Sequence, residues 1–249
     1  MANPVANGSR RGVLRGLVAG GVVAGTGLTL GGAGPAAAAP GARPLGVQNF
    51  VTPANPTDAE TALFAGNLRW VNQQQTHPRE DAARRAVVAG GQAPWAAVVS
   101  CIDSRLPPEL IFDQGLGDLF TTRVAGPVID YAVLGSTAFA ASKSSVKLIV
   151  VLGHERCGAV EYAIGRKDND PAYPPPYSDR LEFLSARIHA AIPPVGTPDR
   201  VNATIDENVR RIKSQLLQEP DIAPRVTAGT INVIGARYDL DTWAVTKVV

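Results

Sequence analysis

Two short patterns constrain this chain more than any other feature of its sequence. Both cysteines and one of the three histidines fall within them: Cys101-Ile-Asp103-Ser-Arg105 and His154-Glu-Arg-Cys157. Each pattern follows a run of β-forming apolar residues, at 96–99 and 146–152, and such runs predict buried parallel strands. Open α/β sheets gather ligand sites at the carboxyl ends of their strands. The two patterns are therefore expected to meet at one edge of a sheet.

The residue types in the two patterns predict a metal site. Two thiolates and one imidazole, from Cys101, Cys157 and His154, form a ligand set suited to zinc. Three protein ligands leave the fourth tetrahedral position open, which is the difference between a catalytic and a structural zinc. The alternative is that both cysteines are small core residues and that His154 is an ordinary loop histidine. We expect one Zn²⁺ per chain.

The pattern along the chain predicts an α/β domain over residues 56–249. Strands are expected at about 95–100, 118–124, 146–152, 230–237 and 242–249. Helices are expected at about 58–75, 79–89, 129–142, 157–164, 181–192 and 201–218, the fourth of these ending at Gly165. Strands that alternate with helices predict a parallel sheet covered on both faces.

Length and charge restrict the class of partner. The chain has 249 residues and is 45% apolar, which suits one globular domain with an extension. Its formal net charge is +2, and no long run of basic residues occurs. This balance gives no support for binding to nucleic acid or to a membrane surface. We expect a small-molecule substrate.

The first 38 residues predict a signal peptide. Ser9-Arg10-Arg11-Gly-Val-Leu14 precedes a mildly apolar stretch at 16–34, and Ala36-x-Ala38 offers a small-residue cleavage site. The paired arginines resemble a twin-arginine export signal. We expect export across the bacterial cytoplasmic membrane, a linker at 39–55, and no stable membrane span in the mature protein. The alternative is an uncleaved anchor or a disordered tail.

The metal patterns resemble the zinc site of the β-class carbonic anhydrases. Further segments match that family in order: 63–70, 90–92, 111–120, 123–126, 133–136, 151–154 and 231–239. The match covers roughly residues 55 to 245. The resemblance implies a central sheet of four parallel strands with an antiparallel edge, flanked by helices. It also implies a homodimer or homotetramer.

Asp103 and Arg105 are the expected catalytic residues. A planar guanidinium can clamp a carboxylate with two parallel hydrogen bonds, which holds Asp103 off the metal. Asp103 is then free to accept a hydrogen bond from a zinc-bound hydroxide and to orient it toward carbon dioxide. If the clamp opens, Asp103 occupies the fourth metal position and closes the site. The resemblance implies both arrangements, and the alternative is a surface salt bridge of small value.

Three further residues are expected to contact the substrate. Gln92 lies nine residues before Cys101, where open-site members of the family carry a substrate-binding glutamine. Phe120 is expected to supply apolar surroundings. The backbone N–H of Gly158 opens a helix beside the metal and is suited to a bicarbonate oxygen. The alternatives are a loop glutamine that faces solvent and a phenylalanine that belongs to the core.

The leading functional hypothesis is zinc-dependent, reversible hydration of carbon dioxide to bicarbonate. A second enzyme hypothesis is hydrolysis of carbon disulfide or carbonyl sulfide on the same scaffold, and a comparison of rates would separate the two. A third is a catalytically silent zinc-binding protein. That hypothesis predicts that replacing Asp103 or Arg105 changes no measurable property.

Overall fold

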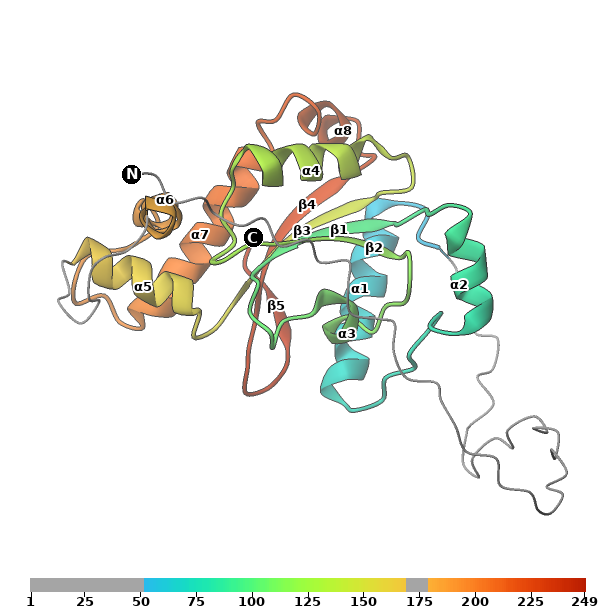
Figure 1. Ribbon diagram of the computed structural model, residues 1–249, viewed down its shortest axis with the longest axis horizontal. Coiled ribbons are helices and arrows are strands. Elements are labelled where there is room, and N and C mark those ends of the chain that lie inside the picture. The colour runs from blue at the N-terminus through green and yellow to red at the C-terminus, as the bar shows by residue number, and fades with distance from the viewer. Residues whose placement is uncertain (1–51, 169–178) are drawn as a thin grey trace, which may run out of the picture. The chain divides into compact units, whose positions relative to one another are not determined.

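A five-stranded mixed sheet forms the centre of the molecule. The computed structural model describes residues 52–168 and 179–249 (Figure 1). The strands are β1 Ala96–Ser100, β2 Leu119–Arg123, β3 Leu148–His154, β4 Asn232–Tyr238 and β5 Val245–Lys247. Their order is β2-β1-β3-β4-β5; the first four are parallel, and β5 is antiparallel to β4. The predicted α/β class and strand arrangement are confirmed. The signal peptide predicted at 1–38 and residues 39–51 of the linker lie outside the described residues.

The two central strands are buried because helices cover both faces of the sheet. Every residue of β1 and β3 is buried, as their continuous runs of valine, isoleucine, leucine and alanine predict. Along these strands, alternate side chains enter two separate apolar clusters. One cluster packs against α1 (Pro56–Val71) and α3 (Pro108–Ile111), and the other packs against α4 (Tyr131–Ser142). These helices lie on opposite sides of the sheet (Figure 1).

The predicted helices are present with corrected ends. They are α1 Pro56–Val71, α2 Ala82–Ala89, α4 Tyr131–Ser142, α5 Gly158–Lys167, α6 Asp179–His189 and α7 Arg200–Leu216. The described residues also form two short helices that the pattern did not predict, α3 Pro108–Ile111 and α8 Ala223–Thr227. The first helix ends earlier than predicted because Gln73 adopts a left-handed conformation, with φ of 55°. The expected stop at Gly165 is wrong. A helical glycine costs only about 1 kcal/mol relative to alanine, and Gly165 is buried where α5 packs.

The strand order changes direction between β1 and β3. The chain leaves β1 toward β2 on one side, and it leaves β3 toward β4 on the other side. The segments after β1 and β3 therefore diverge, which is the arrangement that opens a ligand site at the carboxyl ends of parallel strands. Among the residues that the structure describes, no helix combines the length and the apolar character needed to cross a membrane.

Candidate metal centre

The sheet register brings the three predicted ligands together. Ser100, the last residue of β1, pairs with Leu152 of β3, so the residues that follow both strands emerge side by side. Cys101 follows β1 directly, His154 ends β3, and Cys157 is the N-cap of α5. All three side chains are buried, and their ligand atoms all lie within 4.8 Å of one another. The two sulfur atoms are 3.9 Å apart, and both cysteines are free.

The His154 ring presents an unpaired nitrogen to this cluster. Its Nδ1 lies 2.8 Å from the carbonyl oxygen of Glu155. A carbonyl only accepts hydrogen bonds, so Nδ1 carries the proton and Nε2 carries a lone pair. Nε2 is buried and has no hydrogen-bond partner. A buried acceptor without a partner is unfavourable unless something binds it.

The geometry of the cluster fits a zinc ion. An ion about 2.3 Å from each of two sulfurs at a tetrahedral angle holds those sulfurs about 3.8 Å apart. The observed separation of 3.9 Å between the Cys101 and Cys157 sulfurs agrees with this value. The unpaired Nε2 of His154 supplies a third donor. Two soft sulfurs and one imidazole nitrogen are the donor set of a zinc site with three protein ligands.

The two thiols share a proton unequally. Hydrogen bonding from the Cys157 thiol lowers the pKa of Cys101 against the effect of burial, and the N–H of Gly126 adds to this. The pKa of Cys157 is raised because its proton is held by the Cys101 sulfur and because it is buried. Backbone N–H groups at the start of α5 partly oppose that rise. The cluster therefore already stabilises one thiolate.

Arg105 clamps Asp103 beside the ligand set. Arg105 Nε donates to Asp103 Oδ1 at 2.9 Å, and Nη2 donates to Oδ2 at 2.7 Å. The backbone N–H of Arg105 also donates to Oδ1 at 2.9 Å. These hydrogen bonds lower the pKa of Asp103 to about 2. Asp103 Oδ2 lies 3.9 Å from His154 Nε2, so an ionised carboxylate stands at the edge of the cluster.

Two residues support the cysteine segment in ways that the sequence did not reveal. Arg123, the last residue of β2, donates from Nε to the carbonyl oxygen of Cys101 at 3.0 Å and from Nη2 to that of Asp103. The N–H of Gly126 donates to the Cys101 sulfur at 3.4 Å. In the sequence, the segment 123–126 stands out only as a match to the family. The one signal for a supporting contact is that an arginine, Arg123, ends the strand next to β1.

The predicted substrate contacts do not all reach the ligand set within one chain. Gly158 is exposed and follows Cys157 at the start of α5. Gln92 is exposed and precedes β1, whereas the ligands follow the carboxyl ends of the strands. A strand of five residues is about 16 Å long, so Gln92 lies at the opposite end of the sheet. Phe120 pairs with Ala97 and contacts the ring of Phe139, also away from the ligands.

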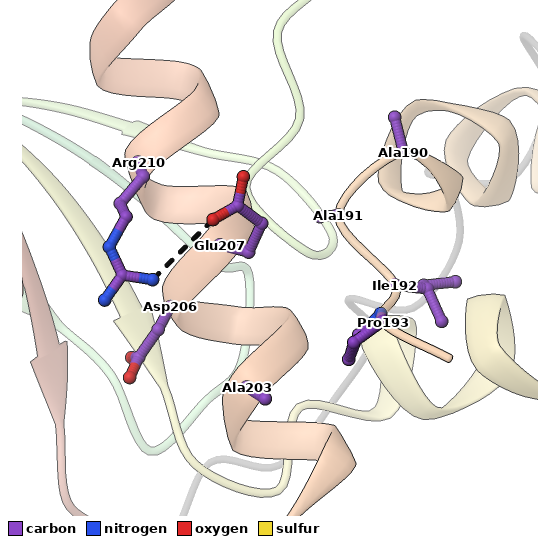
Figure 2. A pocket seen from close by; sticks show the side chains of 8 residues that line it. All are labelled: Ala190, Ala191, Ile192, Pro193, Ala203, Asp206, Glu207 and Arg210. Carbon is purple, nitrogen blue, oxygen red and sulfur yellow. Dashed lines mark ion pairs between the residues drawn. The ribbon is translucent and has the colours of Figure 1, made fainter. Parts of the chain in front are cut away.

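Two hollows lie near α7, and only one touches the ligands. An open pocket of about 520 Å³ separates α7 from residues 190–193 and is lined mostly by small or apolar side chains (Figure 2). Its charged members include the Glu207–Arg210 ion pair at 3.7 Å, and it contains no cysteine or histidine. A smaller cavity is lined by Pro127, Gly153, His154, Cys157, Val160, Ile205, Asn208 and Val209. Of these two, the smaller cavity adjoins His154 and Cys157, whereas Cys101 and Asp103 do not line it.

Known proteins match both the sequence and the fold. The family described as carbonic anhydrase matches residues 96–245. Carbonic anhydrase 2 of Mycobacterium tuberculosis (strain H37Rv) is 38% identical over 192 residues, which cover 75% of this chain and 90% of the relative. A carbonic anhydrase of Mycolicibacterium smegmatis is 39% identical over 187 residues, with the same coverage.

Solved structures show the same fold at lower identity. A structure from a study of two tetrameric β-carbonic anhydrases of Sordaria macrospora has a TM-score of 0.59 at 21% identity, covering 77% of this chain and 96% of the other. The β-carbonic anhydrase CafA of Aspergillus fumigatus has a TM-score of 0.56 at 24% identity, covering 76% and 90%. At this identity the structures establish the shared fold.

Proposed function

This chain belongs to the β class of the carbonic anhydrase family and catalyses the reversible hydration of carbon dioxide to bicarbonate; we propose that the reaction takes place at Cys101, His154 and Cys157 with one zinc ion per chain. The observation that carries this proposal is the unpaired, buried Nε2 of His154, which lies between two cysteine sulfurs and a clamped carboxylate. When bound, zinc supplies a nucleophile by lowering the pKa of a water molecule.

The chain's own residues orient the reactants. Arg105 keeps Asp103 ionised, so Asp103 accepts a hydrogen bond rather than donating one. An acceptor held by two parallel hydrogen bonds fixes the direction in which the nucleophile points, and this positioning lowers the barrier. The exposed N–H of Gly158 lies at the positive end of α5, where a bicarbonate oxygen is stabilised.

We propose a homodimer, or a homotetramer built from dimers, in which the partner completes the site. Gln92 and Phe120 lie at the far end of the sheet from the ligands of their own chain, so they can serve the reaction only at the site of a second copy. Helix α4 exposes aromatic side chains suited to such a contact, with Tyr131 94% exposed and Phe139 57% exposed. Sedimentation analysis of Tyr131→Ala tests this, and a variant as oligomeric as the wild type would oppose it.

We also propose export by the twin-arginine route. The support is the segment Ser9-Arg10-Arg11 followed by a mildly apolar stretch and a small-residue cleavage region. A folded passenger would carry its zinc from the reducing cytoplasm, where thiols stay available as ligands. Replacing both arginines with lysine is expected to retain the protein inside the cell, as measured by fractionation. Unchanged export of that variant would refute the route.

Stopped-flow hydration of carbon dioxide tests the proposed metal centre. The purified enzyme is expected to hold about one equivalent of zinc, to lose activity on chelation, and to recover it when zinc is returned. Full activity without metal would overturn the proposal. The relatives and structures named above are carbonic anhydrases, so they give no support to sulfide hydrolysis or to a silent zinc protein.

A further inference from the structure

A buried asparagine on α7 holds the loop that follows β2. Asn208 is 5% exposed. Its Nδ2 donates to the carbonyl oxygens of Gly126 and Pro127, each at 3.1 Å. A side-chain amide has two N–H donors, and both are used here. The amide therefore fixes two consecutive peptide groups, although it lies 82 residues away in the sequence from the first of them.

The loop that Asn208 holds contacts a metal ligand directly. The N–H of Gly126 donates to the Cys101 sulfur at 3.4 Å. Gly126 has φ of +64°, and a Cβ there would lie 2.7 Å from Ile188 Cδ1 and 3.0 Å from Ala159 Cβ. Gly126 is thus confined by packing at its Cα and by Asn208 at its carbonyl oxygen. Its N–H belongs to the preceding peptide group, which is joined to the held carbonyl through this confined Cα, so the N–H has little freedom to point elsewhere.

Asn208 also borders the other two ligands. It lines the small cavity whose walls include His154, Cys157 and Pro127. Its neighbours on α7 that line the wider pocket, Glu207 among them, do not line this cavity. On α7, Asn208 therefore has two links to the metal ligands. It donates hydrogen bonds to the loop that contacts Cys101, and it lines the cavity whose walls include His154 and Cys157.

We propose that Asn208 is a positioning residue for the metal centre. By holding the Gly126 and Pro127 carbonyls, it aims the Gly126 N–H at the Cys101 sulfur. That hydrogen bond withdraws electron density from the sulfur and fixes its direction, so Asn208 controls both the metal affinity and the electronic character of the site. This inference rests on the proposed zinc function of the same cluster.

A second buried asparagine provides a matched control. Asn67 on α1 is 4% exposed and donates to the carbonyl oxygens of Ile111 at 3.1 Å and Trp243 at 3.0 Å. It therefore joins distant segments in the same way as Asn208. Neither of its acceptors belongs to a loop that bonds a ligand sulfur. Loss of Asn67 removes the same kind of structural link without altering the hydrogen bond to Cys101.

The experiment compares Asn208→Leu with Asn67→Leu in the purified holoenzyme. Leucine is similar in size and donates no hydrogen bond. Zinc affinity is measured by competition with a chromogenic chelator, the sulfur-to-metal charge-transfer band by cobalt substitution, and stability by thermal unfolding. Asn208→Leu is expected to weaken zinc binding about 10- to 100-fold and to shift the cobalt band. Asn67→Leu is expected to lower the Tm while leaving both metal properties unchanged.

The outcomes separate this inference from the proposed function. If the wild type holds no zinc, the proposed function fails. If the wild type binds zinc and hydrates carbon dioxide, but Asn208→Leu keeps wild-type affinity and band position, the positioning role alone is refuted. Equal changes in affinity and band for the two leucine variants refute it as well. If either leucine variant does not fold, the pair Asn208→Ser and Asn67→Ser is judged by the same criteria.

Discussion

Each end of the parallel sheet holds an aspartate that is bound by arginine, and the two aspartates differ in their surroundings and in the roles that we propose for them. At the carboxyl end, Asp103 is clamped by Arg105, only two residues further along the chain. At the amino end, Asp118 precedes β2 and accepts one bifurcated hydrogen bond from Arg79 Nε, at 2.9 Å to each carboxylate oxygen, and one from the N–H of Gly115 at 2.7 Å. Arg84 approaches the same carboxylate at 3.4 Å.

The difference between the two pairs lies in their exposure and in their neighbours. The Arg105 side chain is 51% exposed and that of Asp103 16% exposed, so the pair faces the site opening. The Asp118 side chain is 4% exposed and closed in by its arginines. Asp103 lies beside the buried Nε2 of His154, which has no hydrogen-bond partner. Asp118, by contrast, accepts hydrogen bonds from α2 and from the segment before α2, and so links both to the start of β2. The same type of ion pair therefore has a proposed catalytic role at one end and forms a structural link at the other.

Removing a metal ligand should give the largest difference between the two ends of the sheet. Cys157→Ser replaces a thiolate with a weak hydroxyl donor, so the site is expected to lose zinc and hydration to fall to the uncatalysed rate. Stopped-flow kinetics with metal analysis measures both. Asp118 and its arginines are untouched, so far-UV circular dichroism should remain native. A variant that still turns over at the wild-type rate would contradict the assignment of Cys157.

Asp103→Asn should separate activity from stability. The amide keeps the shape of the carboxylate but loses its charge and one acceptor, so kcat is expected to fall about 100-fold or more, as when a preorganised catalytic hydrogen bond is removed. Because the pair is partly exposed, the Tm should change little. Zinc content is the control and should stay at the wild-type level. An unchanged kcat would show that Asp103 does not act in the reaction.

Asp118→Asn should give the opposite result. Removing one charge from a buried pair leaves its arginine partner uncompensated, which typically costs about 3–5 kcal/mol in the free energy of unfolding. Urea unfolding measures this loss. Zinc content of the folded fraction should match the wild type, because Asp118 lies at the end of the sheet away from the ligands of its own chain. A loss of zinc without a loss of stability would reverse the two roles.

The same contrast explains what could be predicted from the sequence. The ligands and the Asp103–Arg105 pair were predictable because each signal is local: a β-forming run, then a short motif. Strand polarity brought the two motifs together, since both follow the carboxyl ends of adjacent parallel strands. The antiparallel edge came from the family resemblance, because β5 is only 3 residues long and gives a weak pattern of its own.

The supporting contacts could not be predicted because each joins residues that lie far apart in the sequence. Asn208 reaches Gly126 across 82 residues, and Arg123 reaches Cys101 across 22 residues. No spacing rule connects such pairs before the sheet order is known. The predicted helix ends were wrong where tertiary packing overrides local preference, as at Gly165, which is buried within α5. The sequence therefore indicates the reacting groups better than the groups that hold them.

The smallest expected effect concerns Asp113 and its dependence on pH. Burial alone would raise the pKa of Asp113, but hydrogen bonds from the Thr76 N–H, Arg69 and the His77 N–H outweigh it and lower the pKa below its ordinary value of 3.8. A lowered native pKa stabilises the fold above the unfolded-state pKa, and this stability is lost as pH falls through the native pKa. Asp113→Asn is therefore expected to cost about 1.5–3 kcal/mol near neutral pH. The difference in the free energy of unfolding should shrink as the pH falls below 3.8, because the wild-type carboxyl then also becomes neutral.

Urea unfolding of the wild type and Asp113→Asn across this pH range measures the gap between their free energies of unfolding, and loss of metal at low pH affects both proteins alike. A gap that stays constant or widens in acid would show that Asp113 does not act through its charge.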